Sequence, residues 1–227
     1  MNSATLENLY HAASEKTLAM WAKNAGIGEI KKESYYDPVK LALATGIQPA
    51  VPPAVSRLLD ELKQLTRDDL LADTLPEQGL HFTFLPLTLP LYIEHAPLPE
   101  KIAELRALWS GFHAQKIVIR DLRLVALPGQ LLLAGIPDTP ATDLRHAFCE
   151  KVLNSRWKEE LLMRHTGSAL PAPFWHTTLL RYGAAYLPAP LRQFFLARQT
   201  LNYGKVEGEL MLAEVNYNWT TCYPLQD

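Results

Sequence analysis

Apolar residues recur at helical spacing in two N-terminal segments and predict two helices. In residues 3–24 the apolar positions are Leu6, Leu9, Tyr10, Ala13 and Leu18, and the turn "NAGIG" ends the segment. In residues 52–66 they are Val55, Leu58, Leu59, Leu62 and Leu65, all on one face, with Pro53 near the first turn. Between these helices, "GIQPAV" predicts a short strand at a sheet edge, because its proline lacks the N–H that a central strand donates.

The rest of the chain alternates between predicted strands and helices. We expect further helices in segments 98–111, 142–165 and 188–199. Strands are predicted in the apolar segments 79–87, 116–127, 130–136 and 175–182, and as a pair in 205–219. The dipeptide Pro128-Gly129 marks a turn between two of them.

The order of these elements repeats along the chain. Each half contains a helix, an apolar strand with a histidine, a second helix and two strands, although the halves share almost no sequence beyond a His-x-Thr triplet. This order predicts an α/β or α+β protein with two similar lobes. We assign residues 46–227 to a two-lobed domain and residues 1–45 to an N-terminal helical extension. We hypothesise that the extension caps a cleft and narrows the choice of substrate.

Composition limits the classes of partner. The chain has 227 residues, a formal net charge of −2 and a pI of about 6.4, so no overall basic field attracts long nucleic acid. No apolar run approaches the roughly 20 residues that span a bilayer, and the start, "MNSATLENLYHAASEK", does not predict a signal peptide. The two cysteines, Cys149 and Cys222, form no disulfide framework and are expected to be packing residues. We therefore expect a cytoplasmic, monomeric protein that does not bind membranes.

The triplet His-x-Thr occurs in two predicted strands, "LHFTFLPL" and "WHTTLLRY". Because side chains two residues apart in a strand point to the same face, His81 shares a face with Thr83, and His176 shares one with Thr178. If the two lobes pair about a pseudo-two-fold axis, two imidazoles and two hydroxyls meet in one cleft.

Such a set of side chains suits hydrolysis of a phosphodiester. Histidine acts as a base when neutral and as an acid when protonated, and its ordinary pKa of about 6.5 allows both near neutral pH. Threonine hydroxyls donate hydrogen bonds to the phosphate oxygens on which charge accumulates. The chemistry requires no cofactor and no metal, and the sequence carries no His-Glu-x-x-His motif or carboxylate cluster.

The segments "HFTF" and "HTTL" resemble the paired H-Φ-[ST]-Φ motifs of the 2H (two-histidine) phosphoesterases, with Thr177 where an apolar residue is usual. This superfamily includes the bacterial enzymes named 2′-5′ RNA ligases, the cyclic nucleotide phosphodiesterases and the AKAP-type domains. The resemblance covers roughly residues 46–223. It implies an α+β fold in which two pseudo-symmetric lobes, each with a His-x-Thr strand, helices and antiparallel strands, surround a central cleft.

The same resemblance implies roles for the motif residues. His81 and His176 would be the catalytic pair, and Thr83 and Thr178 would bind the substrate phosphate. The expected activity is hydrolysis of 2′,3′-cyclic phosphates or 2′-5′ phosphodiester bonds in nucleotides or short RNA, without a metal. The residues do not distinguish hydrolysis from ligation, or the base from the acid.

Other side chains are candidates for substrate contact. In many members of the superfamily a basic or aromatic residue follows the second motif, where this chain has Arg181 and Tyr182. Strand alternation favours Tyr182, because Arg181 would point away from His176. Tyr36 and its neighbour Tyr35 would suit stacking of a base, although surface packing is the simpler interpretation.

Three alternatives to this activity remain open. A fold of this type that binds a nucleotide or an RNA end without turnover would not need both an acid and a base. A phosphodiesterase for cyclic oligonucleotide signals would use the same residues. In an unrelated α/β protein the motif pair would be coincidence, which predicts that His81 and His176 lie far apart as half-buried structural histidines.

Overall fold

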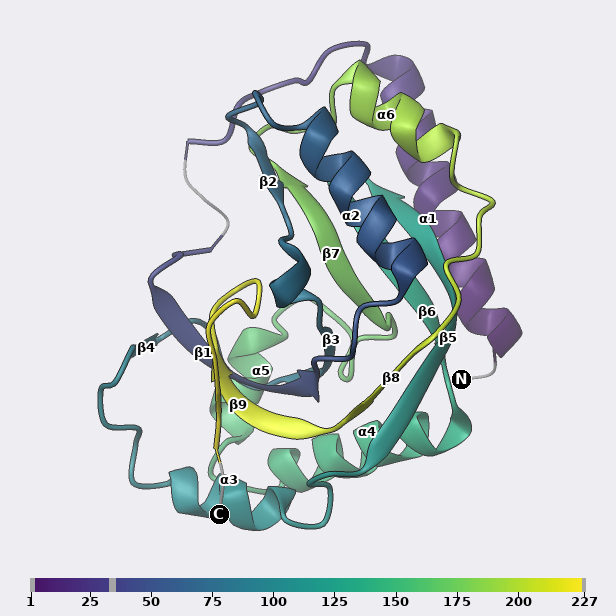
Figure 1. The fold of residues 1–227 in the computed structure, drawn as a ribbon. Coiled ribbons are helices and arrows are strands. Elements are labelled where there is room, and N and C mark those ends of the chain that lie inside the picture. Colours follow the sequence, from purple (N-terminus) through teal and green to yellow (C-terminus); the bar gives the residue numbers. More distant parts are fainter. Residues whose placement is uncertain (1–2, 33–35, 226–227) are drawn as a thin grey trace.

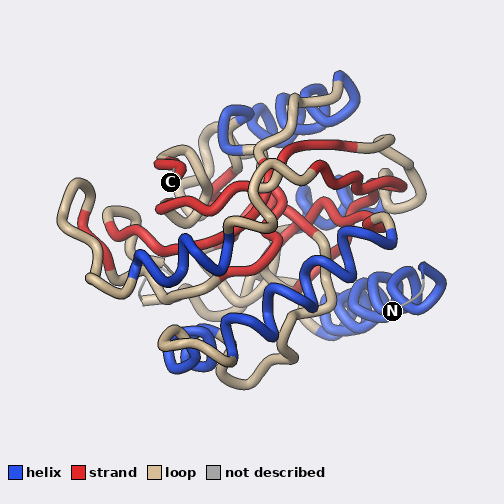
Figure 2. Tube along the Cα trace, turned by 90° about the horizontal axis from the view of Figure 1, so that it is seen from below, coloured by secondary structure: helices blue, strands red, loops and turns tan. Residues whose placement is uncertain are grey.

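The computed structural model describes residues 3–32 and 36–225, which form interleaved helices and strands (Figure 1). The helices are α1 (Ser3–Lys23), α2 (Pro53–Leu65), α3 (Ile102–Trp109), α4 (Thr139–Leu153), α5 (Lys158–Arg164) and α6 (Ala189–Leu196), with a 3₁₀ turn, η1 (Glu77–Gly79). The strands are β1 (Lys40–Ile47), β2 (Ala72–Thr74), β3 (Phe82–Pro86), β4 (Tyr92–Ile93), β5 (Lys116–Leu127), β6 (Gln130–Pro137), β7 (His176–Tyr182), β8 (Val206–Glu209), β9 (Met211–Val215) and β10 (Cys222–Pro224). Helices lie on the outer sides and strands between them (Figure 2).

Helix α2 illustrates how apolar spacing determines an element. Its buried residues are Val55, Leu58, Leu59 and Leu62. Each such side chain contributes about 1.5–3 kcal/mol on removal from water. Leu65, predicted on the same face, is instead exposed at the last turn. The helices predicted from the first two apolar patterns are confirmed as α1 and α2.

The strands of the described residues form two antiparallel sheets. One sheet has the order β10-β9-β1-β3, with β4 paired to the start of β1, and the other has the order β2-β7-β6-β5-β8. The predicted hairpin at Pro128-Gly129 joins β5 to β6. Each sheet contains one His-x-Thr strand region, β3 in the first and β7 in the second, so the α+β prediction is confirmed.

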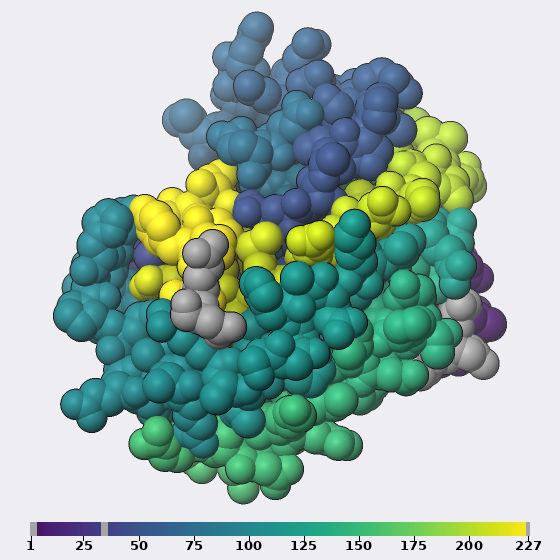
Figure 3. Space-filling view, turned by 60° about the horizontal axis from the view of Figure 1, so that its bottom comes forward, coloured from purple at the N-terminus to yellow at the C-terminus, as the bar shows by residue number. Residues whose placement is uncertain are grey.

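The two sheets do not correspond to the two halves of the chain. Strands β5 and β6 follow the first histidine strand in sequence but lie in the sheet of the second. Strands β9 and β10 follow the second histidine strand but lie in the sheet of the first, where β9 pairs with β1 and β10 pairs with β9. Strands β8 and β9, which were predicted to pair with each other, lie in different sheets, because β8 pairs with β5 and β9 pairs with β1. Figure 3 shows the resulting arrangement at the surface, where the yellow C-terminal segment lies between the blue segment that holds α2 and the teal segment of the middle of the chain. Each sheet therefore takes strands from both halves of the chain, although the order of elements repeats along the sequence.

The prediction of an edge strand at residues 46–51 is also wrong. The strand is β1 (Lys40–Ile47), which lies in the sheet between β9 and β3. Pro49 follows the end of this strand and removes no hydrogen bond from it. Because β1 begins at Lys40, the sheet starts inside the segment assigned to the extension, residues 1–45.

The single helix predicted at 142–165 is two helices, α4 and α5. Helix α4 ends at Leu153, the backbone of Asn154 leaves the helical region, and Trp157 follows in the break. The indole of Trp157 is buried and donates a hydrogen bond to the carbonyl of Lys101 at 3.0 Å. This tertiary contact accounts for a break that the apolar spacing does not reveal.

Helix α1 packs against the β5–β6 hairpin. The buried Tyr10 hydroxyl donates to the carbonyl of Gly135 at 2.8 Å and accepts from the N–H of Trp175 at 3.1 Å. Thr17 donates to the carbonyl of Ala126 at 2.9 Å. Each such bond contributes about 0.5–1.5 kcal/mol. The N-terminal helix thus supports the segment that leads directly into the second histidine.

Candidate active site

The first histidine is held between a turn and an aromatic ring. His81 lies between η1 and β3, is buried, and donates from Nδ1 to the carbonyl of Gly79 at 2.7 Å. Because a carbonyl only accepts, the neutral ring keeps its proton on Nδ1, and Nε2 is the acceptor. The imidazole of His81 also stacks on the indole of Trp219, with the two rings parallel and 5.0 Å between ring centroids. Gly79 is required there, since an added Cβ would lie 2.6 Å from the carbonyl of Asn218.

The second histidine begins strand β7. His176 pairs with Ala134 of β6, and the ring of Phe174 lies edge-on to it with 6.1 Å between centroids. Its Nδ1 is buried and makes no hydrogen bond within the part of the chain that the structure describes. His176 therefore has fixed packing but no fixed proton position.

Both histidines line one cleft of about 180 Å³ between the two sheets. Thr83, Thr178 and Arg181 line it as well. The expectation of coincidence, in which the histidines lie far apart, is wrong.

Each His-x-Thr strand has a bulge directly after its threonine. Opposite β1, the partners of Thr83 and Leu85 are adjacent residues, so Phe84 has no partner. Opposite β6, the partners of Thr178 and Leu180 are adjacent residues, so Leu179 has none. An extra residue in one strand reverses the alternation of side chains beyond it.

This bulge explains why Arg181, and not Tyr182, lines the cleft together with His176. Alternation without a bulge put Tyr182 on the face of His176. With Leu179 extra, Arg181 lines the cleft, whereas Tyr182 turns away and its hydroxyl donates to Asp69 at 3.0 Å.

No protein-family model and no curated protein matches the sequence. Among solved structures, TT0787 of Thermus thermophilus matches with a TM-score of 0.52 at 20% identity, over 82% of this chain and 95% of that one. Escherichia coli LigT complexed with 3′-AMP matches with a TM-score of 0.52 at 15% identity, over 82% and 96%. A structure described as a phosphoesterase matches with a TM-score of 0.50 at 16% identity, over 82% and 96%.

This chain has the LigT fold. The 2H phosphoesterase resemblance predicted this fold from the two motifs, and the prediction is confirmed. Within the LigT fold, the motif strands β3 and β7 belong to different sheets and meet at the cleft.

The cleft keeps both imidazoles neutral at pH 7. Burial lowers the pKa of His81 from 6.5 to about 3, the hydrogen bond to Gly79 opposes this, and the charges of Arg181 and His176 lower it further. Burial lowers the pKa of His176 to about 4, and the charges of Arg181 and Arg145 add to this effect. Positive charge from the arginines therefore surrounds two uncharged rings.

Arg145 lines the same cleft and was not predicted from the sequence as a site residue. Its side chain is buried on α4, its guanidinium lies 3.9 Å from the centroid of the Trp175 ring, and it donates to the carbonyls of Phe174 at 3.3 Å and Pro173 at 3.4 Å. Burial lowers its pKa to about 10. A signal was present, because this arginine falls on the apolar face of its helix with Ala141, Phe148, Cys149 and Val152.

The guanidinium of Arg181 lies close to two aromatic rings, a contact that was not predicted from the sequence. Its guanidinium lies 5.5 Å from the ring centroid of Tyr36 and 5.2 Å from that of Tyr217. The two rings are stacked on each other, with centroids 5.9 Å apart and 18° between planes. Tyr36, considered for base stacking, lines the cleft, whereas Tyr35 is outside the described residues.

No group of three or more His, Cys, Asp and Glu side chains in residues 3–32 and 36–225 is arranged to hold a metal ion. No helix in that part of the chain is both long enough and apolar enough to cross a membrane.

Proposed function

We propose that this chain is a metal-independent phosphodiesterase that hydrolyses 2′,3′-cyclic phosphates or 2′-5′ phosphodiester bonds in nucleotides or short RNA. The observation that carries this proposal is the position of His81 and His176 at one cleft, each with a threonine two residues later. The likeness in fold to LigT complexed with 3′-AMP supports a nucleotide as the ligand.

His81 is the general base in this proposal. Its Nδ1–H is bound to Gly79, so the neutral ring offers the Nε2 lone pair to a water molecule. The water oxygen forms a bond to phosphorus while its proton passes to Nε2. His176 gives a proton to the ribose oxygen whose bond to phosphorus breaks. The two histidines then exchange their protons with solvent, and one P–O bond has been hydrolysed.

The threonines and Arg181 bind the phosphate. Thr83 and Thr178 donate hydrogen bonds to non-bridging oxygens, whose negative charge grows in the transition state. Arg181 supplies the positive charge, and its position beside Tyr36 and Tyr217 restricts its motion. Such preorganised donors typically contribute 10²–10³-fold in rate each, as an order of magnitude.

In this proposal the bound phosphate also changes the protonation state of His176. With pKa values of about 3 and about 4, neither ring is an acid at pH 7 before substrate binds. A phosphodiester anion beside the rings offsets the charges of Arg181 and Arg145, and this raises the pKa of His176 in the complex. Substrate thus promotes the proton uptake that the reaction needs.

The low pKa values also favour a second candidate, a module that binds a nucleotide without turning it over. In that case the neutral rings would only accept and donate hydrogen bonds. A phosphodiesterase for cyclic oligonucleotide signals differs only in its substrate, and the same experiment separates the three.

The test is hydrolysis in EDTA of a panel that contains 2′,3′-cyclic mononucleotides, 2′-5′ oligoadenylate and cyclic dinucleotides. Wild type is compared with His81→Ala and His176→Ala, and with His113→Ala as a control because His113 is exposed in a turn and does not line the cleft. Turnover that resists EDTA and falls by orders of magnitude in the two cleft variants supports the proposal. Turnover that survives in either variant contradicts the assignment, and binding without turnover identifies the binding module.

A further inference from the structure

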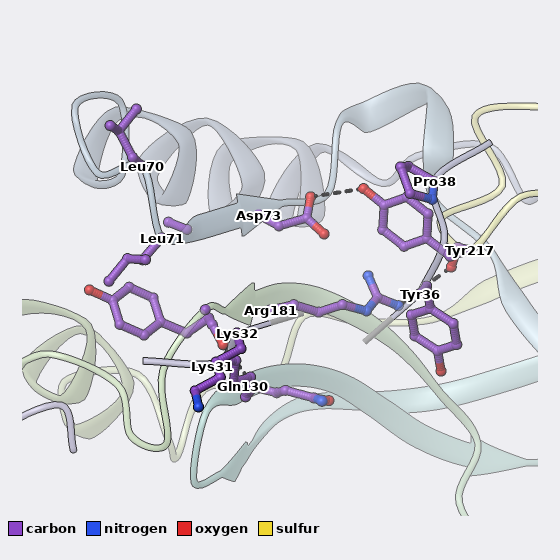
Figure 4. Close-up of a pocket in the computed structure, with 13 residues that line it drawn as sticks. Lys31, Lys32, Tyr36, Pro38, Leu70, Leu71, Asp73, Gln130, Arg181 and Tyr217 are labelled. Carbon is purple, nitrogen blue, oxygen red and sulfur yellow. Dashed lines mark hydrogen bonds between the residues drawn. The ribbon is translucent and has the colours of Figure 1, made fainter. Parts of the chain in front are cut away.

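A second cavity, of about 410 Å³, adjoins the cleft that holds the histidines. The two cavities share Tyr36, Arg181 and Tyr217 as a common wall. In Figure 4 the cavity lies beside Arg181, with Asp73 on one side and Lys31, Lys32 and Gln130 on the other. A ligand that reaches the histidines can therefore extend past Arg181 into this space.

The N-terminal segment forms one wall of the second cavity and is fixed to the main domain. Ile30 forms a bridge with Ala184, and the N–H of Lys31 donates to the carbonyl of Gly183 at 2.9 Å. The Lys31 ammonium donates to the carbonyl of Tyr182 at 2.9 Å. These contacts hold Lys31 beside the end of β7, only a few residues after His176.

The lining of the cavity is mainly cationic. Lys31, Lys32 and Arg181 are opposed by a single carboxylate among the described residues, that of Asp73, which accepts a hydrogen bond from the Tyr217 hydroxyl at 3.2 Å. This arrangement leaves positive charge for an anion, while Gln130 and the tyrosines offer polar and aromatic contacts.

The sizes of the two cavities indicate what they hold. The cleft alone has a volume of about 180 Å³. Pockets that enclose a ligand of drug size, and a nucleotide is a ligand of that size, have volumes of roughly 300–1,000 Å³. The cleft accommodates a phosphate and the sugar that carries it, and the remainder of a longer ligand must extend into the adjoining cavity.

We propose that the second cavity binds the nucleotide next to the scissile phosphate, with Lys31 and Lys32 at its phosphate group. The substrate class is then a short oligonucleotide of two or more nucleotides, and not a mononucleotide. This inference rests on the proposed function for the scissile bond, but binding in the second cavity does not require turnover.

The kinetic test compares adenosine 2′,3′-cyclic phosphate with adenylyl-(3′→5′)-adenosine 2′,3′-cyclic phosphate, which adds one nucleoside and one phosphodiester group. We expect wild type to prefer the dinucleotide by about tenfold or more in kcat/KM, as one charge-assisted phosphate contact would give. In Lys32→Glu this ratio should fall at least fivefold. Lys158→Glu, which reverses an exposed charge on α5 away from both cavities, should keep the wild-type ratio. A wild-type ratio near one, or a Lys32→Glu ratio equal to that of wild type, overturns the inference.

Calorimetry separates this inference from the proposed function. Adenosine 3′-monophosphate and adenylyl-(3′→5′)-adenosine 3′-monophosphate are titrated into wild type, Lys32→Glu and Lys158→Glu. Tighter binding of the dinucleotide, weakened only in Lys32→Glu, supports the second cavity even if no substrate is turned over. Turnover with equal affinity for the two ligands leaves the phosphodiesterase proposal intact and removes the second cavity from it.

Discussion

The imidazole of His81 stacks on the indole of Trp219, with 5.0 Å between ring centroids and 6° between ring planes. Trp219 adopts a φ of 58°, in the left-handed region that non-glycine residues rarely use. Such a conformation costs about 1–3 kcal/mol and persists only where surrounding contacts enforce it. The carbonyl of Trp219 accepts a hydrogen bond from the Gln48 side chain at 2.9 Å. The fold thus maintains an unfavourable backbone conformation that supports the histidine.

Replacement of this indole should impair catalysis more than folding. In Trp219→Leu the imidazole loses its flat support, and we expect kcat to fall about 10- to 100-fold, as misplaced catalytic groups do. Trp219→Phe keeps a ring and should lose less. Trp157→Leu is the matched control, because this buried indole lies away from the cleft. Equal losses of kcat in Trp219→Leu and Trp157→Leu, at equal thermal stability, would show that Trp219 has only a packing role.

The pH dependence of kcat/KM should follow the lowered pKa values of the free protein. Below pH 3 both rings are protonated and no base exists, and well above pH 4 both are neutral and no acid exists. The profile should therefore be bell-shaped with its maximum between pH 3 and 4, so that kcat/KM falls as the pH rises from 4 to 8. Measurement of initial rates from pH 3.5 to 8.5 checks this, and a flat profile between pH 5 and 8 would count against two titrating histidines.

Folding stability should fall as pH falls through the same window. The pKa values of His81 and His176 are about 3 and about 4 in the folded protein, against 6.5 in an unfolded chain. Between pH 6.5 and 4 the unfolded chain binds more protons, so the free energy of unfolding decreases with falling pH. Urea midpoints at pH 7.5 and 5.0 should differ less in His81→Gln/His176→Gln than in wild type. The exposed His113→Gln should keep the wild-type difference, and an unchanged difference in the double variant would contradict the account.

Arg145 should act on His176 by position and by charge. It contacts the carbonyls of Pro173 and Phe174 and the ring of Trp175, which lead into the histidine. In Arg145→Met we expect kcat to fall about tenfold or more. The pKa of His176, followed by NMR, should rise because a nearby cation has gone. Arg145→Lys should restore part of the low pKa, whereas a purely structural role would leave the pKa unaffected in both variants.

The motif residues were predictable because their signal is local. A histidine and a threonine two apart in an apolar strand share a face whatever the strand pairs with, and His81, Thr83, His176 and Thr178 all line the cleft. Helix α2 was predictable for the same reason, since its apolar spacing is contained in one segment.

The bulges and the exchange of strands between sheets depend on distant partners. The hydroxyl of Thr45 on β1 accepts from the N–H of Leu85 and donates to its carbonyl, next to the bulge at Phe84. The sequence of the "HFTF" segment does not predict that Thr45 is its partner. The second bulge forms where β7 pairs with β6, and it places Arg181 in the cleft instead of Tyr182.

Contacts between residues that are distant in the sequence were equally unpredictable. Trp219 lies far along the chain from His81, and its spacing among the other tryptophans carries no signal. Arg145 was detectable as a charge on the apolar face of α4, but its contacts with Pro173, Phe174 and Trp175 join segments that are distant in the sequence.

The most direct test of the two-histidine account separates the base from the acid by the leaving group. A 4-nitrophenyl phosphodiester needs no proton on its leaving oxygen, whereas a ribose oxygen does. In EDTA, His176→Ala should lose about 10²–10⁴-fold in kcat on a 2′,3′-cyclic phosphate but less than tenfold on the nitrophenyl ester. His81→Ala should lose a similar large factor on both substrates. Losses below tenfold on the cyclic phosphate in both variants, or the same loss on both substrates in His176→Ala, would contradict general acid–base catalysis by this pair.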